Sequence, residues 1–144
     1  MRPDASSPLI AGPRWYRRRI RVLGPIYGLI PMMILGAVAL TALELGDGRV
    51  SGLIGLFVGT AAAPGLLVAG APFGDEANYP LAILASVPLW LLLGFVAAIR
   101  ATRRPVAAWS DYARELFYLT IAVGIGSTAA LLVATSIVGE SLIV

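Results

Sequence analysis

The chain has 144 residues, of which 58% are hydrophobic and 13% charged, and its formal net charge is +3 at pH 7. An average soluble domain carries about 25% charged residues, so this composition excludes an ordinary water-soluble domain. The sequence contains no cysteine and no histidine, and all 11 of its cationic residues are arginines. These absences exclude disulfides, thiolate nucleophiles, metal sites held by Cys or His, and Schiff-base chemistry on lysine.

The N-terminal tail, residues 1–23, is polar and rich in proline and arginine, and a second basic segment covers residues 100–115. Arginine and tryptophan at the end of an apolar stretch are typical of a membrane anchor, since each near-surface cation gains about 1 kcal/mol from anionic lipids. We therefore expect anionic headgroups, and not nucleic acid, to be the partners of these charges. The expected anchor residues are Arg14, Trp15, Arg17, Arg18, Arg19, Arg21, Arg103 and Arg104.

Four apolar segments follow the tail, and each is long enough to cross a bilayer, which takes about 20 residues as a helix. They cover residues 24–45, 50–74, 80–99 and 116–139, and a short C-terminal end of residues 140–144 follows. The runs are continuously apolar, whereas the strands of a membrane barrel alternate polar and apolar residues. The sequence therefore predicts an all-α integral membrane protein, with a bundle of four membrane-embedded helices over residues 24–139.

The second segment, residues 50–74, is the weakest of the four because glycines and the pair Pro64-Gly65 interrupt it. If it crosses completely, the arginines divide almost evenly between the two sides of the membrane. If it enters and leaves on one side, ten of the eleven arginines share a side with the tail, which the preference of arginine for the cytoplasm favours. Four crossings, a re-entrant second segment and dual topology all remain open. We expect a plasma-membrane protein with a cytoplasmic tail.

Two of the segments carry small residues at intervals of three or four, a spacing that places them on one face of a helix. Such faces let two helix backbones approach closely in a membrane. Contact within this chain and contact with another chain are both compatible with the pattern. The expected packing residues are Gly52, Gly55, Gly59 and Ala63 in the second segment, and Ala122, Gly126, Ala130 and Ala134 in the fourth.

The fourth segment also has a hydroxyl-bearing face, and its beginning carries a capping signal. Thr120, Ser127, Thr128 and Thr135 form the hydroxyl face, which fits either a polar path or hydrogen bonds to the helix's own carbonyls. Ser110 is predicted as the N-cap of this helix, with Asp111 in its first turn.

No ionisable residue lies near the middle of an apolar segment, and no nucleophile accompanies a base. Proton or ion pathways across membranes normally use such intramembrane charges. We therefore expect no enzyme and no cofactor. The predicted function is that of a non-catalytic accessory subunit packed against other subunits of a larger membrane complex; a homo-oligomeric channel or small transporter is the alternative.

Overall fold

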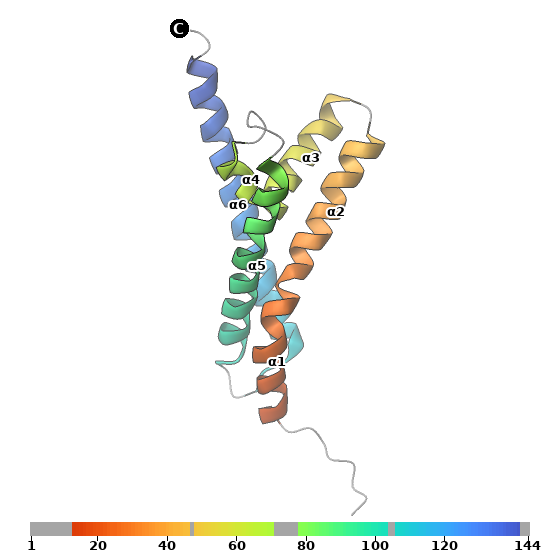
Figure 1. The fold of residues 1–144 in the computed structure, drawn as a ribbon. Coiled ribbons are helices and arrows are strands. Elements are labelled where there is room, and N and C mark those ends of the chain that lie inside the picture. Colours follow the sequence, from red (N-terminus) through yellow and green to blue (C-terminus); the bar gives the residue numbers. More distant parts are fainter. Residues whose placement is uncertain (1–12, 47, 71–77, 104–105, 142–144) are drawn as a thin grey trace, which may run out of the picture.

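The computed structural model describes residues 13–46, 48–70, 78–103 and 106–141, and within these ranges the secondary structure is helical, without strands. The prediction of an all-α protein is therefore confirmed. The helices, shown in Figure 1, are α1 (Pro13–Tyr27), α2 (Leu29–Leu45), α3 (Arg49–Ala62), α4 (Gly65–Val68), α5 (Tyr79–Ala101) and α6 (Trp109–Ser141).

Three helical stretches are long and apolar enough to cross a membrane: Arg14–Leu45, Tyr79–Ala101 and Trp109–Ile137. The first consists of α1 and α2, which follow one another through a single turn residue, Gly28. Residues 13–23, expected in the tail, are thus part of a helix that continues into the apolar segment.

The second apolar segment does not form one long helix. α3 has 14 residues and ends at Ala62, and the four-residue α4 follows only after a break. Pro64 lies in this break, where it removes a backbone donor that a continuous helix would need. Residues 71–74 of the expected segment lie outside the described residues.

The start of α6 differs from the sequence-based expectation. α6 begins at Trp109, so Ser110 already lies inside the helix and the prediction of Ser110 as N-cap is wrong. Asp111 is in the first turn, as predicted. Its Oδ2 accepts a hydrogen bond of 3.2 Å from the backbone N–H of Ala108, which satisfies one of the free donors at the helix start.

α1, the end of α5 and the start of α6 meet at one end of the molecule, which we call the basic end (Figure 1). The α2–α3 turn lies at the opposite end. A cluster of buried apolar residues holds the basic end together: Ile20, Ala97, Ala98, Ala101, Ala107, Tyr112 and Leu116.

α1 and α5 cross with almost no side chain between them. A Cβ on Gly94 would lie 2.6 Å from the carbonyl oxygen of Gly24 and 2.8 Å from the Cα of Gly28. Backbones this close leave room only for glycine, and close packing of this kind is the main attraction between helices in lipid. The three glycines therefore fix how the first long stretch crosses the second, Tyr79–Ala101.

Candidate functional site

The break between α3 and α4 leaves backbone groups without helical partners, and side chains of α5 satisfy them. The indole Nε1–H of Trp90 donates a hydrogen bond of 2.7 Å to the carbonyl oxygen of Ala62, the last residue of α3. Trp90 is completely buried. An unsatisfied buried carbonyl costs about 1–3 kcal/mol, so this bond stabilises the end of α3.

Ser86 completes the same contact one helical turn earlier on α5. Its Oγ accepts a hydrogen bond of 2.9 Å from the backbone N–H of Gly65 and donates one of 3.0 Å to the carbonyl oxygen of Ala82. Gly65 itself lies directly against α5, since a Cβ there would collide with the Ala82 oxygen. The broken segment is therefore docked on α5 through both backbone hydrogen bonds and close packing.

Sequence reasoning did not identify Ser86 or Trp90. The available signal was a serine and a tryptophan four residues apart inside an apolar segment, which places them on one face of a helix. Their partners, Gly65 and Ala62, lie 21 and 28 residues earlier in the chain. Such a pairing becomes visible only when the packing of α4 and α3 on α5 is known.

At the basic end, two arginines of α1 bind the C-terminus of α5 through Thr102. Arg17 donates a hydrogen bond of 3.1 Å to the Thr102 carbonyl oxygen, and Arg21 Nε donates one of 3.0 Å to its hydroxyl oxygen. Thr102 is fully buried and is the C-cap of α5. Cations at a helix C-terminus are favourable because the helix dipole is negative there. These bonds bring the two arginine-rich segments to the same end of the molecule.

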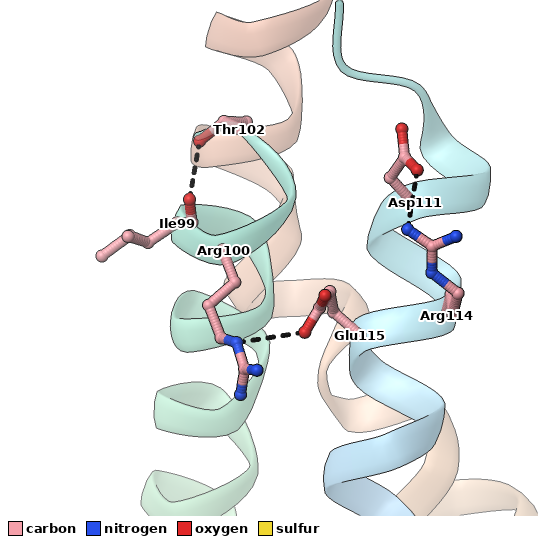
Figure 2. Close-up of polar contacts among 6 residues, drawn as sticks. All are labelled: Ile99, Arg100, Thr102, Asp111, Arg114 and Glu115. Atoms are coloured by element: carbon pink, nitrogen blue, oxygen red, sulfur yellow. Dashed lines mark hydrogen bonds and ion pairs between the residues drawn. The ribbon is translucent and has the colours of Figure 1, made fainter. Parts of the chain in front are cut away.

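Two ion pairs also lie at this end (Figure 2). Arg100 on α5 and Glu115 on α6 pair at 3.1 Å, and Arg114 pairs with Asp111 within α6, also at 3.1 Å. The Arg100 side chain is 51% exposed, and pairs of this kind contribute about 0–1 kcal/mol in water. Both pairs lie on the outside of a contact that the buried cluster already holds.

The other expected anchor residues lie on the outside of α1 and at the end of α5. Trp15 is exposed, with the guanidinium of Arg19 stacked 4.8 Å from the centre of its ring. Arg103 is exposed just after α5, whereas Arg104 lies outside the described residues. One shallow hollow of about 300 Å³ is lined by Arg14, Arg17, Arg18, Arg21 and Val22.

The small-residue face of α3 points partly toward α2. A Cβ on Gly55 would lie 2.5 Å from Cγ of Leu43, and one on Gly59 would make an ordinary contact of 3.6 Å with the Cβ of Ala39. Ala63 is buried, while Gly52 has open space around it and is exposed.

The small-residue face of α6 has different surroundings. Ala122, Gly126, Ala130 and Ala134 are all exposed, and a Cβ on Gly126 would meet nothing within 4 Å. α6 instead turns Tyr112, Leu116, Ser127 and Leu131 inward, and all four are buried. The face with closely spaced small residues is thus left uncovered by the described part of the chain.

The described residues contain no group of three or more Asp, Glu, His or Cys side chains that could hold a metal ion. The hydroxyls of Thr120 and Thr135 donate to the carbonyl oxygens of Leu116 and Leu132 in their own helix. The hydroxyl face of α6 is also divided, since Ser127 is buried and Thr135 is exposed. These side chains therefore do not line a common polar surface within one chain.

No family model, no curated protein and no solved structure matches this chain.

Proposed function

We propose that this chain is a non-catalytic subunit of a larger complex in the plasma membrane, with three complete crossings and a re-entrant second segment. The break at Ala62 supports the re-entrant segment, because α3 is only 14 residues long and a complete crossing takes about 20. Irregular backbone within a bilayer is tolerated where other protein covers it, and Trp90 and Ser86 provide that cover.

A re-entrant second segment also places most of the arginines on one side of the membrane. Arg17 and Arg21 bind Thr102, so the tail and the α5–α6 loop belong on one side of the membrane. Arginine-rich segments prefer the cytoplasm, and we place the basic end there. Its exposed arginines would lie among anionic headgroups, where each near-surface cation gains about 1 kcal/mol.

The observation that carries the subunit role is the uncovered small-residue face of α6. Four small residues at intervals of four form a strip along this 33-residue helix, and all of them are exposed. Lipid acyl chains pack no better against such a strip than against other apolar helix faces. A transmembrane helix of another chain, in contrast, can approach the strip closely enough for backbone packing. We infer that the partner of this face is a transmembrane helix of a different subunit.

A substitution on this face tests the role. Gly126→Leu places a large side chain in the strip and should abolish co-purification of partner chains in mild detergent. Because a Cβ on Gly126 meets nothing within this chain and leucine favours a helix over glycine, the melting temperature of the isolated protein should not fall. Gly36→Leu is the matched control, since a Cβ there also meets nothing within 4 Å, and it should retain the partners.

Two outcomes would contradict the subunit role. One is partner recovery that Gly126→Leu leaves unchanged. The other is recovery of only further copies of this chain, together with ion conductance in liposomes that Thr128→Val abolishes, because hydroxyls and carbonyls alone can line a pore. The second outcome would establish the homo-oligomeric channel instead.

A further inference from the structure

An apolar groove of about 810 Å³ runs along the outside of the molecule between the α1–α2 stretch and the first half of α6. On one wall it is lined by Tyr27, Ile30, Pro31, Ile34 and Leu35, and on the other by Trp109, Tyr112, Ala113, Leu116, Phe117 and Thr120. Its volume falls in the range of about 300–1,000 Å³ that is typical of ligand pockets.

The groove exists because α3 is short. α3 runs antiparallel to α2, with Gly55 opposite Leu43 and Gly59 opposite Ala39. Each step of four residues along α3 therefore corresponds to four residues backward along α2. A continuation of α3 in the same register would lie beside Leu35 and then Pro31, which form one wall of the groove. The break at Ala62 leaves this space without a helix.

Of the four lining side chains that can form hydrogen bonds, Tyr27 and Trp109 lie at the basic end, and Tyr112 and Thr120 already have partners. Away from the basic end, the walls therefore require no hydrogen bond from an occupant. The Tyr112 hydroxyl donates to the Gly24 carbonyl oxygen at 2.6 Å, and the Thr120 hydroxyl donates to the Leu116 carbonyl oxygen at 2.9 Å. A polar ligand would lose its hydration here without compensation. The occupant is therefore hydrocarbon.

We propose that the groove binds an acyl chain of an anionic membrane phospholipid whose headgroup lies at the basic end. From Trp109 to Thr120 the groove follows α6 for about 17 Å at 1.5 Å per residue. One leaflet of a bilayer whose hydrocarbon core is roughly 30 Å thick measures about 15 Å. The length of the groove thus matches one layer of acyl chains.

The two ends of the groove match the two ends of a lipid. At the basic end Trp109 packs edge-on against Tyr27 and Tyr112, with ring centres 5.2 and 5.7 Å apart. Tyrosine and tryptophan are typical of the headgroup level of a membrane. Arg114 at this end is paired with Asp111, so the net positive charge of the basic end comes from exposed arginines such as Arg18 and Arg103, and this charge favours an anionic headgroup.

A helix of another protein fits this groove less well than a lipid. Helices pack closely in membranes through small residues, whereas large side chains such as Ile34, Leu116 and Phe117 form the walls, and the small lining residues are Ala113 and Thr120. This inference is independent of the partner proposed for α6, because it concerns the isolated chain.

Native mass spectrometry of the purified chain in detergent, with added phosphatidylglycerol, tests the inference. Ala113→Trp and Ile34→Trp each place a large side chain in the groove from opposite walls, and both positions are exposed. We expect both variants to lose the phosphatidylglycerol adduct that the wild type retains. Ala122→Trp is the matched control on the same helix, since Ala122 is exposed and does not line the groove, and it should keep the adduct.

Phosphatidylcholine with the same acyl chains should give a weaker adduct with the wild type, because its headgroup carries no net negative charge. The proposal is overturned if both groove variants fold and bind phosphatidylglycerol as the wild type does. It is also overturned if the wild type binds no lipid, or if it is a dimer that the groove variants dissociate. The last result would identify a second copy as the occupant. Loss of partner chains in Gly126→Leu is a separate readout, so the two proposals can fail separately.

Discussion

α3 and α6 carry the same pattern of small residues, but the pattern has a different consequence in each. On α3, Gly55 and Gly59 face α2 of the same chain. On α6, Gly126 and its neighbours on the face are exposed. The spacing of small residues therefore indicates that a helix can be approached closely, whereas the identity of the approaching helix depends on the rest of the fold.

The largest effect on stability is expected where two backbones of this chain touch. Gly94→Leu inserts a side chain into the α1–α5 crossing, where a Cβ already lies 2.6 Å from a carbonyl oxygen. Overpacking of this kind costs typically 1–3 kcal/mol and occasionally more, and we expect about 3 kcal/mol here. Thermal unfolding in detergent, followed by circular dichroism, measures the loss. Gly36→Leu enters open space and should be at least as stable as the wild type, and equal melting of the two variants would show that α1 and α5 do not cross at Gly94.

Trp90→Phe should increase local opening of the backbone between α3 and α4 more than it lowers the free energy of unfolding of the whole protein. The variant keeps an aromatic ring but leaves the Ala62 carbonyl without its donor, and an orphaned buried acceptor costs about 1–3 kcal/mol. Hydrogen exchange at residues 63–67 should accelerate, while exchange in α1 changes little. Trp15→Phe, at an exposed position, serves as the control. Unchanged exchange in the Trp90 variant would mean that the indole does not hold the end of α3.

A smaller effect is expected within the small-residue face of α3. Gly55→Leu must displace the Leu43 side chain, whereas Gly52→Leu enters open space. Both variants replace glycine by leucine, which favours a helix by on the order of 0.5–1 kcal/mol, so the difference in stability between them isolates the packing. We expect Gly55→Leu to be less stable than Gly52→Leu by about 1 kcal/mol in the same unfolding assay. Equal stability would place the Gly55 face away from α2.

The smallest effect is expected at the ion pair between α5 and α6. Arg100→Gln removes one partner of Glu115, but the arginine side chain is half-exposed, and exposed pairs contribute about 0–1 kcal/mol. The change in unfolding free energy should stay below about 1 kcal/mol and should shrink as salt is added. A larger loss would mean that this pair, and not the buried cluster around Ile20, holds the basic end.

The sequence was sufficient to predict the fold class, because continuous apolar runs of this length form helices in a bilayer. It also indicated Pro64 as the point where the second segment is interrupted, since proline removes a backbone donor. The α1–α5 crossing at Gly94 and the role of Trp90 were not predictable, since each depends on contacts between residues far apart in the chain. The start of α6 was predicted incorrectly because Ser110 is a common N-cap residue. In the structure the helix begins at Trp109, and Asp111 in its first turn accepts the hydrogen bond from the Ala108 N–H.

The central claim is that the second segment returns to the side from which it enters, so that both arginine-rich segments share the cytoplasmic side. The chain has no cysteine, so single cysteines can report accessibility. Val106, in the α5–α6 loop, is 76% exposed, and Val50, at the start of α3, is 71% exposed. Each is replaced by cysteine in a separate variant and treated in intact cells with a membrane-impermeant thiol reagent.

We expect Val50→Cys to react in intact cells and Val106→Cys to react only after the cells are opened. The reverse pattern would preserve the arrangement of the helices but contradict the cytoplasmic placement of the basic end. Reaction of both cysteines in intact cells would place the α2–α3 turn and the α5–α6 loop on the same outer side, and this result would contradict the re-entrant second segment.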